Sequence, residues 1–508
     1  MPALALVDRI QSRSLRIALL AILLAFGFLG SRGIWDPDEG RYTNVALTML
    51  DTGDWLNPQR NDDTGHWTKP PLTYWAIAGS VATFGPNPWA ARLPVALSYL
   101  FCIWMAWRCA RRLAPGTEAM AAVVYATMLL PFGAANYITT DFIVAATQAL
   151  AVHAFIEARF GARQHAHRWM WLMWIAYAAA FMAKGPPGLL PLLATMALEW
   201  LAPSSRPRRW LPTLSGVVLF LALALPWYVA VVMRHDGLLH YFIGAEVVDR
   251  VASNRFGRNG EWYGWLKVYG PTLALGTLPW TPTLWRWCRG LPGRLGGWRD
   301  RRVRQSGAAE LLLALWVLVP LLVFCLSRSR LPLYVLPLFV PIAVLVALQR
   351  QREGRLAVDW RWLCVWVVLL LGLRIAAAAF PTNKDASVWA DEIRERSRGQ
   401  VTEVIFVEDM ARYGLHLHLG VEIEKVSLEA LRESRRFNPA FDEPLATELA
   451  ETMDEPGAIY VVKQARWRSV RSRIRALGYR PVPLGTPYQG RVMFEVRSKA
   501  SRPDRDGD

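Results

Sequence analysis

Long apolar runs separated by short polar segments fill the first three quarters of the chain. A helix needs about 20 mostly apolar residues to cross a bilayer, and Trp residues flank many of these runs in the manner of interfacial anchors. We predict eleven membrane spans, over residues 15–33, 91–110, 117–135, 142–160, 169–184, 187–202, 211–233, 267–285, 309–327, 332–349 and 361–380. The pattern therefore predicts an α-helical polytopic membrane protein and excludes a soluble globular protein for residues 1–380.

The last 128 residues have a different pattern. Four β-branched runs, typical of strands, lie at residues 401–409, 421–428, 457–464 and 491–498. A helix-like stretch is found at 465–478, and the final SRPDRDGD is expected to be disordered. We therefore predict two domains, a membrane domain over 1–380 with a first outer loop at 34–90, and a small C-terminal α/β domain over 381–508.

The basic residues are unevenly distributed along the 508-residue chain, whose formal net charge is +17. Residues 381–508 hold 21 basic and 21 acidic side chains, so the whole excess lies in residues 1–380. With the N-terminus placed in the cytoplasm, the inner segments carry 23 basic and eight acidic side chains, and the outer ones carry twelve acidic side chains. This asymmetry is typical of bacterial inner-membrane proteins. It places the C-terminal domain in the periplasm and argues against nucleic-acid binding.

The first span has a basic start and an apolar core but no small-residue cleavage site after it, so we expect a retained anchor rather than a signal peptide. The five cysteines lie in or beside apolar runs. Their positions indicate neither a disulfide framework nor a cysteine metal site.

Acidic residues open the first outer loop, in the stretch WDPDEGRYTNVALTMLDTGDW. Asp38 and Glu39 follow Pro37 in the first turn of a predicted short amphipathic helix, where the helix dipole favours negative charge. With Asp36, they form an acidic group beside the bilayer. The alternatives are a solvated loop start and a divalent metal site made of these three carboxylates.

Lys69 lies in the same loop, in GHWTKPPLTYW. The two prolines after it stiffen the backbone and restrict Lys69 to an extended conformation. A rigidly held ammonium suits a phosphate. A lysine that snorkels to the membrane interface is the alternative.

Three further outer segments carry charge. Asp141 in NYITTDFIVA starts the fourth span, as a helix cap or as an acid facing a cavity. Glu246 and Arg250 are four residues apart in the next outer loop, a spacing that also fits a helix-surface ion pair. Arg330 and Tyr334 lie in SRSRLPLYVLPLF, where a cluster of outer arginines calls for a polyanionic headgroup.

These motifs carry a family resemblance. DPDEGRY, KPPLTYW, TTDF, LPWYV, an ExxxR segment and SRSRLPLYVLP occur in this order between residues 35 and 337. The pattern resembles the polyprenyl-phosphate-sugar-dependent membrane glycosyltransferases of family 39, which include the protein O-mannosyltransferases and the lipid A aminoarabinose transferases. The resemblance implies a GT-C-like fold and transfer with inversion.

The resemblance also implies residue roles. Asp38 and Asp141 match acids needed for activity, and Glu39 is grouped with them as catalytic. Tyr42, Lys69 and Tyr334 match residues that contact the donor phosphate; Arg250 and Arg330 are expected to neutralise it; and Arg41 and Glu246 are candidates for acceptor contacts. Thr68 stands where the aminoarabinose transferases have a carboxylate. We therefore expect no required metal, with Asp36, Asp38 and Glu39 as the alternative divalent-ion site.

We therefore expect an enzyme that transfers a sugar from an undecaprenyl-phosphate-linked donor. The expected acceptor is a lipid A-like or other extracytoplasmic molecule, with protein O-glycosylation as an alternative. A transporter or flippase of lipid-linked sugars explains the spans, but transporters bind near the bilayer midplane, where this sequence has almost no charge. A structural assembly protein that uses its outer tail is a third alternative.

Overall fold

The computed structural model describes residues 2–204, 214–248, 259–380, 382–429, 437–452 and 457–498. It divides the chain into two compact units. Unit 1 comprises Met1–Leu29, Lys69–Thr73 and Arg92–Ala376, and unit 2 comprises Gly30–Thr68, Tyr74–Ala91 and Ala377–Asp508.

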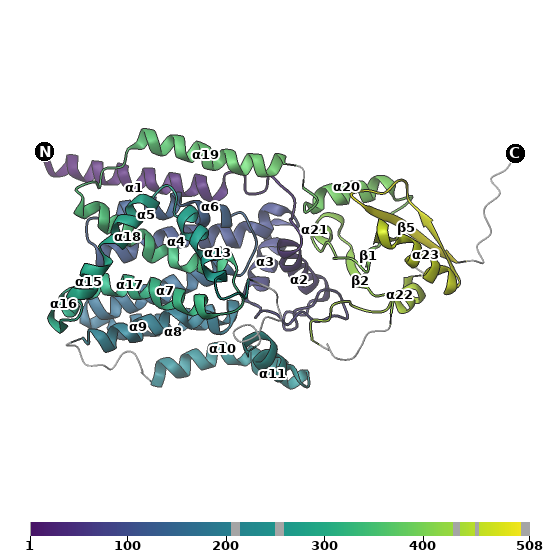
Figure 1. The fold of residues 1–508 in the computed structure, drawn as a ribbon, viewed down its shortest axis with the longest axis horizontal. Helices are drawn as coiled ribbons and strands as arrows, with labels where there is room; N and C mark the ends of the chain where they lie inside the picture. The colour runs from purple at the N-terminus through teal and green to yellow at the C-terminus, as the bar shows by residue number, and fades with distance from the viewer. Residues whose placement is uncertain are drawn as a thin grey trace. The chain divides into compact units, whose positions relative to one another are not determined.

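Unit 1 is helical (Figure 1). It contains α1 (Pro2–Phe26), most of α4 (Pro88–Leu113), α5 (Glu118–Thr127), α6 (Leu129–Ala134), α7 (Asp141–Phe160), α8 (Ala166–Lys184), α9 (Leu190–Leu201), α10 (Leu214–Arg234), α11 (Leu238–Tyr241), α13 (Gly264–Gly276), α14 (Thr281–Arg289), α15 (Leu291–Gly297), α16 (Arg301–Ser306), α17 (Ala308–Leu326), α18 (Phe339–Arg352) and α19 (Trp360–Ala379). Short 3₁₀ turns occur at η1 (Arg163–His165), η2 (Pro186–Leu189) and η4 (Pro332–Leu338), and η3 (Phe242–Val248) is π-helical.

The helices of unit 1 pack around one continuous apolar core. Helix α7 packs along α8, α17 packs along α9, and α18 packs against α5 (Figure 1). Buried small residues occur on these helices, among them Ala145 and Ala149 of α7 and Ala176 of α8. Small side chains let helix backbones approach closely in an apolar solvent, where packing rather than hydrophobic burial drives association.

Six helices in the described residues are long and apolar enough to cross a membrane: Pro88–Leu113, Asp141–Phe160, Leu214–Arg234, Ala308–Leu326, Pro332–Arg352 and Trp360–Ala379. Shorter apolar helices occur at Ser14–Phe26, Leu72–Phe84 and Glu118–Thr127. Every stretch predicted as a span is at least partly helical where it is described. The multi-pass membrane protein is confirmed, and the count of eleven spans stays a prediction.

Unit 2 is built on a five-stranded sheet in the order β2-β1-β3-β5-β4. The strands are β1 (Glu403–Val407), β2 (Glu422–Val426), β3 (Ala458–Lys463), β4 (Tyr479–Pro483) and β5 (Arg491–Ser498). Strand β1 is parallel to β2 and β3, while β5 is antiparallel to β3 and β4. The predicted α/β tail is therefore confirmed, including its four predicted strands.

Both faces of the sheet are covered, because alternate side chains of a strand point to opposite faces. Val404 and Phe406 join one apolar cluster with Trp389 of α20 (Ala386–Arg396) and Leu415 of α21 (Leu415–Leu419). Ile405 and Val407 join the other cluster, which includes side chains of α22 (Leu445–Glu451) and α23 (Trp467–Ala476). The turn η7 (Gln464–Arg466) precedes α23.

Unit 2 also includes the loop segment 30–68, with α2 (Asp38–Thr52), and most of α3 (Leu72–Phe84). Ile34 and Asp36 exchange backbone hydrogen bonds with residues 384–386, at 2.9 Å each. Arg60 forms an ion pair with buried Asp442 at 2.8 Å. The first outer loop and the C-terminal residues thus share one compact unit. The domain boundary predicted at residue 380 is based on hydropathy alone and assigns the loop to the membrane domain.

Candidate functional site

In unit 1, the Asp141 carboxylate forms an ion pair with the Lys184 ammonium. Asp141 is the first residue of α7 and Lys184 is the last residue of the adjacent helix α8. A helix N-terminus favours an acid and a helix C-terminus favours a base, so the backbone of each helix supports the charge that it carries. Both side chains are nearly buried. The side chain of Asp141 is therefore turned toward a cation, and the alternative of a simple helix cap does not describe it.

Tyr334 lies beside this pair. Its ring centroid is 4.4 Å from the Lys184 ammonium, within the range of a cation–π interaction. Phe324 joins it to buried Tyr269, because each of these two tyrosine rings contacts the Phe324 ring. The Tyr269 hydroxyl has no hydrogen-bond partner among the described residues. Asp141, Lys184, Tyr269 and Tyr334 thus form one polar group in the apolar interior of unit 1.

Lys69 forms a second paired ammonium in unit 1. Its Nζ lies 3.4 Å from Glu246 Oε2, and both side chains are about seven-eighths buried. Glu246 also accepts a hydrogen bond of 3.2 Å from the Tyr241 hydroxyl. Arg250, predicted as the partner of Glu246 and as a ligand of the donor phosphate, lies outside the described residues. Lys69 is therefore held by a carboxylate rather than extended toward solvent.

The Arg330 guanidinium is buried and donates to backbone carbonyls. It reaches the carbonyl oxygens of Asn259 at 2.6 Å and Glu261 at 2.7 Å through Nη1, and that of Cys325 at 2.9 Å through Nη2. These bonds join the segment after residue 258 to the turn that follows α17. The described contacts of Arg330 thus hold the backbone in place.

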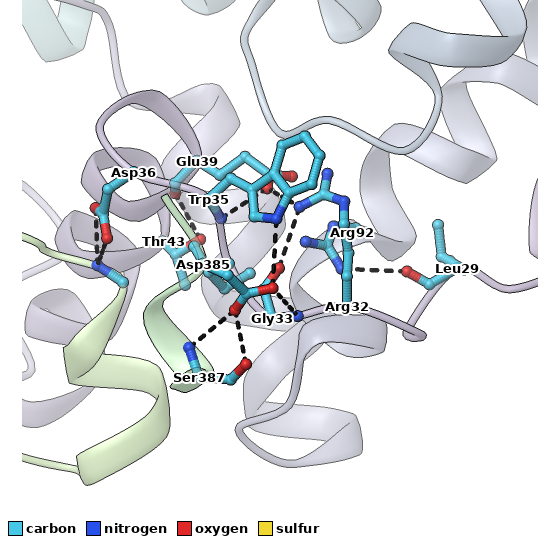
Figure 2. Close-up of polar contacts among 12 residues, drawn as sticks. Leu29, Arg32, Gly33, Trp35, Asp36, Glu39, Thr43, Arg92, Asp385 and Ser387 are labelled. Carbon is cyan, nitrogen blue, oxygen red and sulfur yellow. Dashed lines mark hydrogen bonds and ion pairs between the residues drawn. The ribbon is translucent and has the colours of Figure 1, made fainter. Parts of the chain in front are cut away.

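In unit 2, the acidic residues of the first loop face different partners (Figure 2). Glu39 is fully buried, lies 2.5 Å from Arg32 Nη1 and accepts the Trp35 backbone N–H at 3.0 Å. Asp36 is also buried and accepts the Gly414 backbone N–H at 3.1 Å. Glu39 Oε2 and the Asp36 carboxylate are thus engaged by an arginine and by backbone N–H groups, and the divalent-ion alternative for Asp36, Asp38 and Glu39 stays a prediction.

Asp38 is the accessible member of the acidic group. It begins α2, its carboxylate accepts a 2.8 Å hydrogen bond from Arg41 one turn later, and its side chain is about half exposed. Tyr42 follows Arg41 in the same helix, and its ring stacks on that of Tyr74 with 5.8 Å between the ring centroids. Gly53, with φ of 70°, ends α2 in the left-handed conformation that glycine adopts readily. Helix α2 therefore presents Asp38 and Arg41 as a partly solvated pair beside a packed aromatic residue.

Burial raises the pKa of the Asp36 carboxyl to about 7, although the Gly414 N–H and Arg412 act in the opposite direction. The folded chain then holds this proton from pH 3.8, the ordinary pKa, up to about pH 7. In that range the folded state binds more protons than the unfolded state, so the free energy of unfolding falls as pH rises and levels off above pH 7.

Asp36→Asn should therefore raise the thermal midpoint at pH 8 and leave it nearly unchanged at pH 5, because Asn resembles the protonated acid and its Oδ1 still accepts the Gly414 N–H. Thermal unfolding in detergent at the two pH values measures this. An equal shift at both pH values would contradict the raised pKa.

Lys184 and Tyr269 were not among the residues predicted for the site. Hydropathy marks Lys184 as one of the few charges inside an apolar run, but its partner Asp141 lies 43 residues earlier on another helix. Tyr269 has no signal of its own in the sequence. Only the packing of the helices brings it near Tyr334.

The sequence is similar to a known family and to named enzymes. A family model described as dolichyl-phosphate-mannose-protein mannosyltransferase matches residues 68–230, which include Lys69, Asp141 and Lys184. The undecaprenyl phosphate-alpha-4-amino-4-deoxy-L-arabinose arabinosyl transferase of Pectobacterium carotovorum is 33% identical over 66% of this chain. The enzyme of the same name from Pectobacterium atrosepticum is 32% identical over 72%. The matches span 59% and 65% of these relatives' lengths.

Solved structures extend the likeness to the whole fold. The ArnT protein of Cupriavidus metallidurans, determined with undecaprenyl phosphate bound, superposes with a TM-score of 0.76 at 20% identity, over 95% of this chain and 97% of that one. The chain has the GT-C fold of membrane glycosyltransferases. An Archaeoglobus fulgidus oligosaccharyltransferase matches this GT-C chain with a TM-score of 0.54 at 12% identity, over 95% of it and 73% of the archaeal chain. The fold class predicted from the motifs is thereby confirmed, as is the resemblance to the aminoarabinose transferases.

Proposed function

We propose that this protein transfers a sugar from an undecaprenyl-phosphate-linked donor to a lipid A-like acceptor at the outer face of the bacterial inner membrane. The observation that carries the proposal is the 33% identity to a named arabinosyl transferase over two thirds of the chain. The fold, shared with a protein solved with undecaprenyl phosphate, supports it.

The two paired lysines of unit 1 supply the chemistry for the donor. The donor carries a phosphodiester, and its phosphate gains negative charge as the glycosidic bond breaks. Lys69 and Lys184 each lie against one carboxylate, and a phosphate can compete with that carboxylate for the ammonium. A cation held in a water-poor site stabilises the charge that develops on the leaving group.

Tyr42 and Tyr334 donate hydrogen bonds to the donor phosphate, and Arg250 adds a charge to it. Arg330 acts through the backbone that it holds, and Glu39 acts by fixing the start of α2 through Arg32. Arg41 orients the Asp38 carboxylate, and Glu246 orients the Lys69 ammonium.

The reaction itself is a single displacement. Asp38 takes the proton of the acceptor nucleophile, which attacks the anomeric carbon, and the bond from that carbon to the phosphate oxygen breaks with inversion. Undecaprenyl phosphate leaves, and Asp141 keeps Lys184 in place for it. The step uses no metal.

Transfer by the purified protein in detergent, from a synthetic polyprenyl-phosphate sugar to lipid A, tests the proposal. Mass spectrometry of glycolipids from a strain without the gene gives the matching result in cells. Loss of one sugar from a lipid is expected. Two results together would overturn the proposal and favour a transporter. The lipids of the strain without the gene would be unchanged, and the purified protein would move the donor across a liposome membrane without transferring its sugar.

A protein acceptor is the second candidate, favoured by the family model, whose description names a protein mannosyltransferase. The same transfer assay with exported proteins in place of lipid A distinguishes the two acceptors. Sugar on protein and none on lipid would select this alternative.

We further propose the full topology, with eleven spans, the N-terminus in the cytoplasm and the C-terminal residues in the periplasm. An alkaline phosphatase fusion after Asp385 should be active, and one after Arg206 should be inactive, because the enzyme folds only outside the cytoplasm. The six long apolar helices support a multi-pass chain. The opposite activity at either fusion point would overturn the topology.

Lys69→Ala should lower kcat/KM for a synthetic donor by about 10- to 100-fold, since a hydrogen bond to a charged group contributes about 1.5–3 kcal/mol. Both binding and turnover should suffer, because the phosphate gains charge in the transition state. Lys69→Arg should restore only part, since a planar guanidinium does not replace a point charge. Lys267→Ala, at an exposed lysine of α13, is the control. Normal kinetics of Lys69→Ala would remove Lys69 from the site.

A further inference from the structure

Three glutamates of unit 2 that have no role in the proposed transfer lie close to one another. Glu403 lies on β1, Glu424 on β2 and Glu448 on α22. One carboxylate oxygen of each lies within 4.8 Å of the other two. Three negative groups this close need protons or a cation between them.

The fold brings these residues together for a local reason. Glu424 pairs with Ile405 in the parallel register of β1 and β2, and Glu403 lies two residues before Ile405, so both glutamates lie on the face of Ile405. Glu448 lies between Leu445 and Leu449 in the helical spacing that α22 uses to cover this face. Glu448 therefore occupies a position of α22 at which the spacing of Leu445 and Leu449 predicts an apolar core residue.

Glu424 and Glu448 each have a buried carboxylate oxygen that accepts no N–H or hydroxyl from the described residues. Glu448 is 2% exposed, and its Oε1 has no hydrogen-bond partner among the described residues. Glu424 accepts one bond, from the Asn61 amide at 2.9 Å, and its other oxygen is also buried without a partner in the described part of the chain. The nearby Arg60 pairs with Asp442 instead. Within the described residues, neither Glu424 nor Glu448 forms an ion pair with a lysine or arginine.

Burial is the main cause that raises the pKa of Glu424 and of Glu448, because an apolar setting disfavours a charged carboxylate. The Glu448 side chain has hydrogen-bond partners in the carboxyls of Glu424 and Glu443, which requires a proton between them. A cation among the three glutamate oxygens would take the place of such shared protons.

We propose that Glu403, Glu424 and Glu448 bind a divalent cation, and that this cation is calcium. All the ligands are oxygens, which hard cations prefer, whereas zinc sites use mainly histidine and cysteine. Calcium binds oxygens at about 2.3–2.6 Å, so oxygens on opposite sides of it lie about 4.6–5.2 Å apart. Magnesium, at about 2.0–2.1 Å, requires oxygens within about 4.2 Å of one another. The three oxygens lie within 4.8 Å of one another, which leaves room for the larger ion.

The ion would also stabilise the contact between the first outer loop and strand β2. Asn61 donates to Glu424, and the Asp62 backbone N–H donates to Glu422 at 2.8 Å, both on strand β2. A cation that fixes Glu424 against α22 therefore fixes the strand on which the segment around Asn61 rests. Calcium would stabilise unit 2, which also includes α2 with Asp38.

Calorimetric titration of the full-length protein in detergent, first stripped with a chelator, measures calcium binding, and thermal unfolding measures its effect. We expect one calcium ion per chain and a rise in Tm of about 5 °C or more at saturation. Glu448→Gln should weaken binding at least about tenfold and abolish the rise. Glu451→Gln, at an exposed glutamate one turn away on α22, is the matched control and should behave as the unaltered protein.

Glu424→Gln provides a second variant and should give the same loss as Glu448→Gln. Glutamine keeps the size of the side chain and removes a buried acid, so both variants should remain folded without calcium. Absence of calcium binding by the unaltered protein, or equal binding by Glu448→Gln and Glu451→Gln, would overturn the proposal. A larger rise in Tm with magnesium than with calcium would overturn the choice of ion.

Discussion

Asp38→Asn should lower kcat for sugar transfer by about 100-fold or more while the protein stays folded. A general base usually contributes at least about 10²-fold to the rate, and asparagine cannot accept the proton. Asp38 is half exposed and, among the described residues, pairs only with Arg41, one turn along α2. Because exposed pairs contribute at most about 1 kcal/mol to stability, the substitution should hardly change thermal unfolding.

The measurement is transfer from a synthetic donor at saturating acceptor, with thermal unfolding in parallel. Asp63→Asn removes an exposed acid of the same loop and should leave both unchanged. Arg41→Gln should lower the rate less than Asp38→Asn, because it removes only the hydrogen bond that orients the Asp38 carboxylate. More than about a tenth of the activity remaining in Asp38→Asn would exclude Asp38 as the base.

Hydropathy predicts the helices of this chain well because a bilayer requires every backbone group to be paired within the chain that crosses it. It predicts their interruptions less well. The run 117–135 is apolar after Glu118, yet α5 ends at Thr127 and α6 begins at Leu129. The run 267–285 is likewise divided between α13 and α14. Mean hydropathy over a run does not show such a break, although Pro131, Pro279 and Pro282 lie beside the two breaks.

Strand β4 shows a different kind of failure. Residues Tyr479–Pro483 contain two prolines, which remove backbone donors and argue against a strand. The strand lies at the edge of the sheet, where one side of the backbone needs no partner, and there proline is tolerated. The other four strands are predicted from their β-branched runs, and apolar clusters lie on both faces of the sheet.

Side-chain partners could not be read from the sequence. Asp36, Asp38 and Glu39 were predicted as one acidic group, but two of them are buried and held by Gly414 and Arg32. Glu448 gave no signal, because an acid within a short polar helix resembles any solvated residue. Burial of charge is a property of the packed structure, and the residues that neutralise it lie far away in the sequence.

Substitutions of Asp141 and Lys184 distinguish most clearly between a structural role and a catalytic role of this ion pair. Removing one member of a buried ion pair leaves the other uncompensated and costs about 3–5 kcal/mol. Asp141→Asn should therefore abolish transfer and also lower stability. Loss of activity in this variant alone cannot separate the two causes.

The double variant Asp141→Asn with Lys184→Gln removes both charges at once, and replacing both members of a buried pair is often nearly neutral for stability. We expect thermal unfolding close to that of the unaltered protein and transfer reduced by about 100-fold or more, because the ammonium that would bind the donor phosphate is gone. The pair Arg159–Glu199 is equally buried in unit 1, on helices α7 and α9. Its double variant, Arg159→Gln with Glu199→Gln, should keep transfer activity. If the Asp141–Lys184 double variant transferred sugar as well as this control, the pair would serve only to hold α7 against α8, and Lys69 and Arg250 would remain as the cations for the phosphate.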